Sequence, residues 1–235
     1  MPLTFLAAKQ DVARNVGGSA IAAQTTIAGS AIIDAIRELD FRHDWEFQLV
    51  TLADITVVAG TATYALTPGG SNPPVKKIHS ARLKTNKRTL VYARQRHVDR
   101  IVRNQEQVDI PVAYMEVRSA TGVSIQLVPP PSQGDILQVR TFLHIDDTYA
   151  DGDSLNVPDR YLPALLALAR YNFLIDRDSD DSRAQTFLAK AEQRIQDAIN
   201  DDMGNPDEDF RLIPSDEWNY AFGPNPITDL MDVDF

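Results

Sequence analysis

Cysteine is absent from this chain of 235 residues, and histidine and tryptophan are scarce, with four and two copies. Without cysteine, disulfides, thiolate metal sites and thiol nucleophiles are excluded. No apolar run approaches the roughly 20 residues that a membrane-spanning helix requires. The segment Met1–Leu6 has neither a cationic leader nor a long apolar run, so we expect no secretory signal. The remaining composition, 43% hydrophobic and 24% charged, is ordinary for a globular protein.

Familiar catalytic motifs are also missing. The sequence contains no Gly-x-Ser-x-Gly elbow, no glycine-rich phosphate loop and no His-Glu-x-x-His pair. The scattered histidines lack the spacing of a zinc site, and they are His43, His79, His97 and His144. We therefore predict a protein that is not an enzyme and needs no cofactor. A hydrolase with converging carboxylates is kept as a remote alternative.

One aspartate-rich segment, 176–181, has some features of a calcium-binding loop. Its acids occupy the first, third and fifth positions of such a loop. Asp181 stands where the loop needs glycine, and Phe187 stands where it needs a bidentate glutamate. We favour a polar turn between two helices, in which Asp180 or Asp181 caps the second helix, and we predict no metal site.

Charge is distributed unevenly along the chain. Residues 1–143 hold 16 basic and 12 acidic side chains, whereas residues 144–235 hold 7 and 21. Segment 76–103 has ten basic residues and one acid, Asp99. This asymmetry indicates opposed electrostatic faces of the kind used in head-to-tail subunit contacts, although two solvated surfaces would look the same.

The basic segment is our candidate for a subunit-contact patch. Its residues are Lys84, Lys87, Arg88, Arg94, Arg96, Arg100 and Arg103. Single-stranded nucleic acid would also require interleaved aromatic residues, and only Tyr92 lies nearby. We favour an acidic protein partner or the acidic half of a neighbouring subunit, with duplex DNA as the weaker possibility.

Helical periodicity marks both ends of the folded part. Residues 1–45 contain a weak helix near 3–15 and a stronger one with apolar residues from Ile27 to Leu39, for which Thr25 or Thr26 is a plausible N-cap. Trp45 follows as a possible anchor. Residues 159–203 carry two apolar stripes separated by a polar turn, which predicts an αα-hairpin with Pro158 or Pro163 in its first turn. The two stripes are Leu162, Leu165, Leu166, Ala169 and Phe173, then Ala184, Phe187, Leu188, Ala191, Ile195 and Ala198.

Between the helices, short β-rich runs are separated by turn signals. The expected strands lie within 47–58, 61–66, 78–83, 89–92, 112–118, 123–128 and 136–145. Asn86-Lys87 resembles a hairpin tip, with Asn86 suited to a left-handed conformation. A helical insertion near 94–104 is possible. We predict an α+β fold in which a helical domain, 1–45 with 159–203, holds an inserted antiparallel β-sandwich or barrel-like domain, 46–158.

The last 32 residues, 204–235, form an extended arm in this prediction. They contain four prolines, five aromatics, eight acids and a single basic residue, Arg211. Disordered tails normally lack aromatics, so we expect the arm to dock, either on a partner or on its own domain. Its candidate contact residues are Phe210, Leu212, Ile213, Trp218, Tyr220 and Phe222.

The order of these elements resembles a known family over about residues 20–202. The matching stretches are Asp44–Phe47, Gly60–Leu66, the hairpin ending in Leu90, Pro111–Tyr114, Val123–Pro131 and Leu155–Pro158 before the helix hairpin. They resemble the head-to-tail adaptor (connector) proteins of short-tailed bacteriophages, the group that includes tail tubular protein A.

The resemblance implies a structural virion protein at the head–tail junction, made in the host cytoplasm. Such adaptors form a ring, typically dodecameric, that binds the portal, receives the tail nozzle and extends the channel for double-stranded DNA without reading its sequence. It implies a helical bundle with an inserted β domain, an arm that reaches the portal, and neither cofactor nor membrane. A carbohydrate- or surface-binding tail module is the main alternative.

Overall fold

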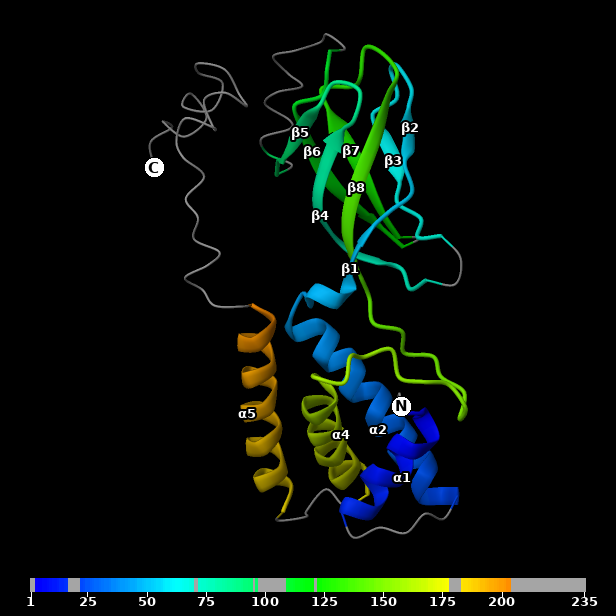
Figure 1. Cartoon of the computed structure of the whole chain (residues 1–235), viewed down its shortest axis with the longest axis vertical. Helices are drawn as coiled ribbons and strands as arrows, with labels where there is room; N and C mark the ends of the chain where they lie inside the picture. The colour runs from blue at the N-terminus through cyan, green and yellow to red at the C-terminus, as the bar shows by residue number, and fades with distance from the viewer. Residues whose placement is uncertain are drawn as a thin grey trace. The chain divides into compact units, whose positions relative to one another are not determined.

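The structure is a computed structural model that describes residues 3–16, 22–69, 72–94, 96, 109–120, 122–177 and 183–203. Residues 1–202 form one compact unit, and the remainder of the chain forms a second. The first unit is a mixed α+β fold in which helices precede and follow the strands, as the sequence predicts (Figure 1). Within the described residues there are four α-helices and one eight-stranded sheet.

Two helices precede the sheet. Helix α1 spans Phe5–Asn15 and begins at Thr4, whose hydroxyl oxygen accepts a hydrogen bond from the amide of Ala7. Helix α2 spans Ala22–Arg42. The hydroxyls of Thr25 and Thr26 donate to the carbonyl of Ala22, so both residues lie inside the helix rather than before it. The predicted N-cap is therefore wrong, because a threonine hydroxyl can also bond a carbonyl of the preceding turn.

Two helices follow the sheet, α4 (Leu162–Arg177) and α5 (Ala184–Asp202). Helix α4 contacts α1, α2 and α5, and Pro163 lies in its first turn as predicted. Both predicted stripes face the core: Leu165, Ala169 and Phe173 are buried on α4, and four residues of the second stripe are buried on α5. The proposed turn at 178–182 lies outside the described residues.

The strands form one curled sheet rather than two facing sheets, which agrees better with the barrel-like form of the prediction than with a sandwich. Its order is β1-β8-β4-β5-β6-β7-β3, with β2 also paired to β8. The strands are β1 (Leu49–Thr51), β2 (Ile55–Val57), β3 (Thr63–Ala65), β4 (Val75–Leu83), β5 (Arg88–Tyr92), β6 (Ala113–Ser119), β7 (Gly122–Val128) and β8 (Asp135–Leu143).

One strand pair departs from the antiparallel prediction. β5 and β6 are parallel, with Val91 opposite Ala113. A parallel pair cannot be closed by a hairpin and needs a longer crossover connection. That connection includes the predicted insertion at 94–104, which lies outside the described residues except for Arg94 and Arg96.

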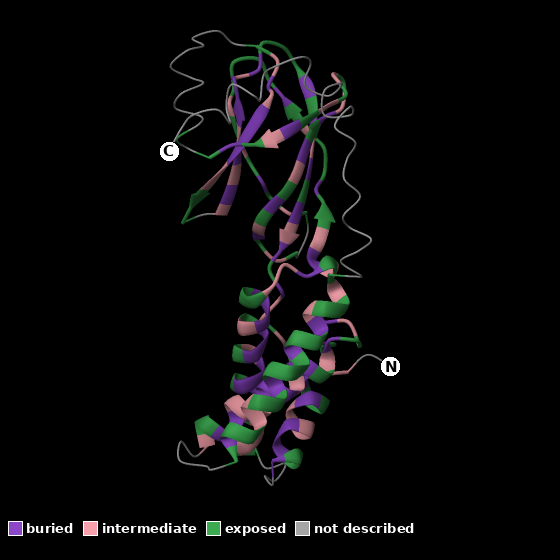
Figure 2. Cartoon of the chain, turned by 90° about the vertical axis from the view of Figure 1, so that its left-hand side faces the viewer, coloured by how far each residue is buried: buried purple, intermediate pink, exposed green. Residues whose placement is uncertain are grey.

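Burial separates into a large core among the helices and a smaller core inside the sheet, with a small third cluster beside it (Figure 2). In β8 alternate residues from Leu137 to Leu143 are buried, the period-two pattern of a strand with one solvated face. Trp45 is fully buried in the helical core, where its indole N–H donates to the carbonyl of Leu39 at 3.0 Å. Its ring lies 4.8 Å from that of Tyr161, so the predicted role of Trp45 as an anchor is confirmed.

Candidate functional site

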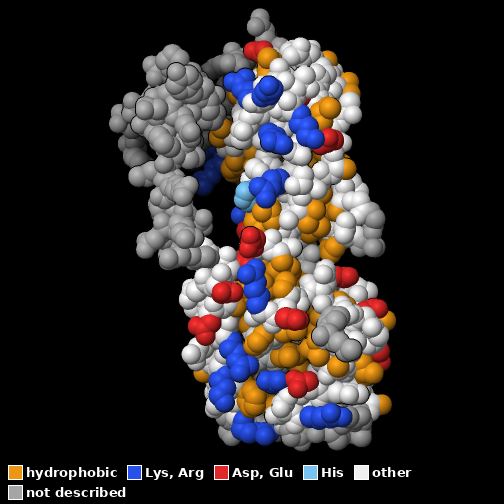
Figure 3. Space-filling model, in the orientation of Figure 1, with side chains coloured by type: hydrophobic (Ala, Val, Ile, Leu, Met, Phe, Trp, Pro, Cys, Tyr) orange, Lys and Arg blue, Asp and Glu red, His pale blue; other side chains and the backbone are white. Residues whose placement is uncertain are grey.

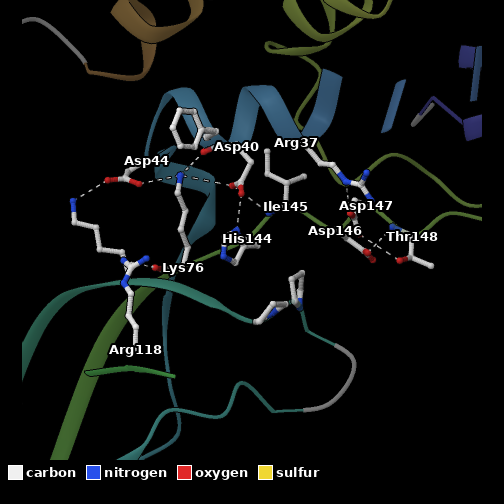
Figure 4. Close-up of a pocket in the computed structure, with 14 residues that line it drawn as sticks. Arg37, Asp40, Asp44, Lys76, Arg118, His144, Ile145, Asp146, Asp147 and Thr148 are labelled. Carbon is white, nitrogen blue, oxygen red and sulfur yellow. Dashed lines mark hydrogen bonds and ion pairs between the residues drawn. The ribbon is translucent and has the colours of Figure 1, made fainter. Parts of the chain in front are cut away.

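The end of helix α2 meets the sheet in a cluster of charged side chains (Figure 4). Lys76 of β4 extends its ammonium group to the helix, where it donates to the carbonyl oxygens of Asp40 and His43, the latter at 2.7 Å. The same nitrogen lies 3.0 Å from Oδ1 of Asp44. The last carbonyls of a helix lack intrahelical partners and carry partial negative charge, so a cation there stabilises the helix end. Lys76 thus joins a strand to a helix.

Asp40 is the buried acid of this junction, only 8% exposed. Nδ1 of His144, which follows β8, lies 2.7 Å from its Oδ2. Its Oδ1 accepts hydrogen bonds from the amide of Ile145, at 3.4 Å, and from the side chain of Gln48. The carboxylate therefore connects α2 to both chain segments that join the sheet to the helices.

Asp44 is held by two lysines. Burial would raise the pKa of Asp44, but hydrogen bonds from Lys77, at 2.9 Å, and from Lys76 outweigh it and leave the pKa below its ordinary value. A hollow of about 730 Å³ adjoins these groups, and Arg37 lies across it, paired with Asp147 at 2.8 Å. The acids and bases of this cluster form ion pairs with one another. Such pairs hold the helix and the sheet in position, and they do not activate a nucleophile.

A second cluster anchors the end of α5, immediately before residues 204–235. The side chain of Asp202 is 3% exposed and accepts hydrogen bonds from the amide of Glu46, at 3.0 Å, and from the hydroxyl of Tyr161. His43 Nε2 lies 2.9 Å from its Oδ2. Burial, and then the hydrogen bond to Asp202, raise the pKa of the Tyr161 phenol well above its ordinary value. The last residue of α5 is thereby fixed beside the α2–β1 link.

The structure places three residues of the predicted basic patch around the β4–β5 turn. Lys87 has φ of 50°, and Lys84 pairs with Asp54 at 2.6 Å. The hairpin tip is confirmed, but the left-handed residue is Lys87 and not Asn86 as predicted. Arg88 opens β5 beside it. Arg94 and Arg96 are exposed, whereas Arg100 and Arg103 lie outside the described residues.

Hydrogen bonds to Asp135 account for the left-handed conformation falling on Lys87 rather than on Asn86. Its carboxylate accepts hydrogen bonds from the amide of Thr85, at 2.9 Å, and from the side-chain amide of Asn86, at 2.6 Å. Asn86 is therefore occupied as a donor, and the next residue takes the left-handed conformation. Burial would raise the pKa of Asp135, but the N–H donors outweigh it and hold the pKa below its ordinary value.

The sequence prediction missed two arginines on the outward face of the sheet. The strand pairing sets Arg140 opposite Ser80 and Thr51, and Arg82 opposite Gln138. Arg82 and Arg140 are both exposed and line one shallow hollow. The period-two pattern of the predicted strands already put both residues on the polar face, but it could not show that they lie on neighbouring strands.

The remaining predicted site residues are not described. All six candidate arm residues, from Phe210 to Phe222, lie beyond residue 203. Asp178, Asp180 and Asp181 of the aspartate-rich segment 176–181 also lie outside the described residues. Within the described part, no group of three or more acids or histidines could hold a metal ion. Burial, and then the nearby charge of Asp34, raise the pKa of Asp176 at the edge of that loop.

Comparison with family models identifies the chain. A model of the SU10 adaptor protein matches residues 3–210, which includes both helical segments and the whole sheet. The chain belongs to the SU10 adaptor protein family. This is a family of phage head-to-tail adaptors, so the resemblance stated from the sequence is confirmed, and the SU10-family chain is a structural component of a phage virion. No protein with curated annotation matches it.

Family membership also bears on chemistry and location. The role of an adaptor is structural, which implies a protein without enzymatic activity. No helix in the described residues is both long and apolar enough to cross a membrane.

Proposed function

We propose that this SU10-family chain forms a ring between the portal and the tail nozzle, a dodecamer as the adaptor resemblance implies, and that the ring extends the DNA channel. The observation that carries the proposal is the adaptor-family match over 3–210. The charged clusters support it, because they hold the helices, the sheet and the end of α5 together within residues 1–202. A ring subunit has to hold such a geometry while neighbours load it.

Within the ring, we assign separate tasks to the parts of the chain. A helical domain, 1–45 with 159–203, packs against neighbouring copies, and a β domain, 46–158, faces the next ring or the nozzle. Helix α5 supports the first assignment, since it packs mainly on α4 and leaves most of its polar side chains exposed. Acidic residues lining the channel keep DNA from adhering, and a strongly basic channel wall would contradict this assignment.

The arm, 204–235, docks on the portal in this proposal. Its aromatic residues are costly to leave in water, since burying a large apolar side chain contributes roughly 1.5–3 kcal/mol. Asp202, the last residue of α5 before the arm, is held by the amide of Glu46. The contact residues are Phe210, Leu212, Ile213, Trp218, Tyr220 and Phe222.

The test compares the whole chain with a chain ending at Met203 and with a full-length variant in which the arm's contact residues are serine. Both variants should keep the circular dichroism and unfolding midpoint of the whole chain and should fail to join purified portal rings in native mass spectrometry. Portal binding that survives both changes would rule out the arm as the portal contact.

The same measurement tests the ring itself. Complexes of the whole chain with portal should show a fixed number of copies, with twelve as the expectation from the resemblance. A surface-binding tail module, the rival function, would instead remain without a ring in the presence of portal and would bind glycan through an aromatic cleft on the sheet.

A further inference from the structure

The outward face of the sheet presents two arginines, Arg82 and Arg140, that pair with no carboxylate among the described residues. Arg82 on β4 and Arg140 on β8 line a hollow of about 510 Å³ together with uncharged residues only. Those residues are Thr51, Ser80, Ala81, Thr89 and Gln138. Arg82 donates to Oε1 of Gln138 at 2.6 Å, a neutral partner. Figure 3 shows blue side chains gathered on the visible face over the sheet, with few red ones among them.

Three arginines on the helices, in contrast, have carboxylate partners. Arg37 pairs with Asp147 at 2.8 Å, Arg42 with Glu192 at 2.6 Å, and Arg170 with Asp11 at 2.6 Å. These three arginines thus have carboxylate partners, as does Lys84 at the end of β4, which pairs with Asp54, whereas Arg82 and Arg140 have none among the described residues. Because arginine binds carboxylates through two parallel N–H groups, the face suits a carboxylate-rich ligand.

Apolar side chains share the face with the arginines. Alternation along β8 puts Ile136 and Phe142 on the same side as Arg140, and Ile136 is 40% exposed. The Phe142 ring contacts His79 of β4 edge-on, with the ring centroids 5.5 Å apart. A ligand that fits this face therefore needs acidic and apolar groups close together along one chain.

The C-terminal segment has that composition. It holds eight acids and one basic residue, and its acidic clusters Asp207–Asp209 and Asp216-Glu217 each directly precede an aromatic residue, Phe210 and Trp218. Its 32 residues can extend to roughly 100 Å, whereas a compact unit of this size has a radius of gyration of only about 16 Å. The sheet face is thus within reach of the segment attached to the same molecule.

We propose that the outward face of β8, β4 and β5 is the docking site of residues 204–235 of the same chain in the free subunit. The arginines Arg82 and Arg140 bind the acidic clusters, and the flanking apolar side chains cover the aromatics. This goes beyond the ring function. It shields the arm from water before assembly, and portal docking then displaces the arm from the sheet.

Duplex DNA is the competing ligand, since its phosphates also attract arginine. The tethered segment has two advantages over it. A tethered ligand reaches an effective concentration in the millimolar range, and the segment can cover the apolar side chains Ile136 and Phe142, which the sugar–phosphate backbone of a duplex cannot do.

Tryptophan fluorescence of the full-length chain tests the proposal. Trp45 is fully buried, so acrylamide quenching that changes between variants reports on Trp218. The test variant combines Arg82→Glu with Arg140→Glu. The control combines Arg14→Glu with Lys190→Glu, the same change of charge at exposed positions on α1 and α5. A synthetic peptide of residues 204–235 gives the quenching of a free segment.

We expect Trp218 to be quenched several-fold less in the unmodified chain and in the control than in the peptide, and protection should fall in high salt. The test variant should approach the peptide. If it unfolds, Arg82→Gln with Arg140→Gln replaces it and should show the same loss of protection. Protection that is absent from the unmodified chain, or unchanged in a folded sheet variant, would overturn the proposal.

Two further outcomes identify other ligands. Protection that disappears on dilution would place the segment on a second copy and overturn docking within one chain. Duplex DNA binding that depends on both arginines, while Trp218 stays accessible, would make the face a nucleic-acid surface instead. Portal binding is measured separately, so the arm can fail to dock on the sheet and still bind the portal.

Discussion

Lys76 and Lys77 are adjacent lysines with different surroundings, and replacing each by methionine separates a junction contact from a surface contact. The side chain of Lys76 is 13% exposed and that of Lys77 is 53% exposed. Methionine preserves most of the aliphatic stem of lysine, so the change removes the ammonium group with little loss of volume. Both lysines approach Asp44, which makes Lys77→Met a matched control.

The expected losses differ because the two ammonium groups leave different partners behind. Removing one member of a buried ion pair costs about 3–5 kcal/mol, but Asp44 keeps Lys77, and Asp40 keeps His144 and Gln48. We therefore expect Lys76→Met to lower the free energy of unfolding by about 2–3 kcal/mol. An exposed pair contributes about 0–1 kcal/mol, the loss expected for Lys77→Met.

Urea denaturation followed by circular dichroism measures both losses, and thermal unfolding should show a midpoint roughly 5–10 °C lower for Lys76→Met. The lysines hold the pKa of Asp44 below its ordinary value, so their contribution is complete above about pH 4 and is lost as the pH falls through the lowered pKa. The difference between Lys76→Met and the unmodified chain should narrow in acid. Equal losses for the two variants would refute the distinction between buried junction and exposed surface.

Three more predictions concern the other clusters. Asp202→Ala should lower the free energy of unfolding by about 1–3 kcal/mol, because it removes a buried carboxylate that accepts hydrogen bonds from the amide of Glu46 and the hydroxyl of Tyr161. The exposed Asp201→Ala should cost less than about 0.5 kcal/mol, and equal urea midpoints for the two variants would contradict this prediction. Asp135→Asn should speed hydrogen exchange of the Asn86 amide, which donates to the Asp135 carboxylate, and unchanged exchange would contradict a role for that bond in the turn. The free energy of unfolding of this variant should also depend less on pH below pH 4, since the lowered pKa of Asp135 contributes stability that acid removes. The raised pKa of Tyr161 contributes stability below about pH 10 that is lost as the pH rises further. The free energy of unfolding of Tyr161→Phe should therefore fall less steeply with rising pH than that of the unmodified chain. Parallel curves of unfolding free energy against pH for the two proteins would contradict this prediction.

Patterns that repeat over a few residues were sufficient for much of the fold. The helical stripe through Leu165 and Phe173, the alternation along β8 and the turn at Asn86-Lys87 each depend on neighbours in the sequence, and the structure has all three. The order of elements also gave the adaptor resemblance that the family match confirms. Trp45 was recognisable as an anchor because a large aromatic residue follows the helix directly.

The tertiary structure decided the contacts between distant parts of the chain. Lys76 meets Asp40 across 36 positions and Asp202 meets Glu46 across 156, and no local pattern predicts either pair. The parallel pairing of β5 with β6 and the placing of Arg82 beside Arg140 both depend on strand order and register. The physical reason is that periodicity specifies which face of an element is buried, whereas the partner of a charged side chain is set only when elements pack.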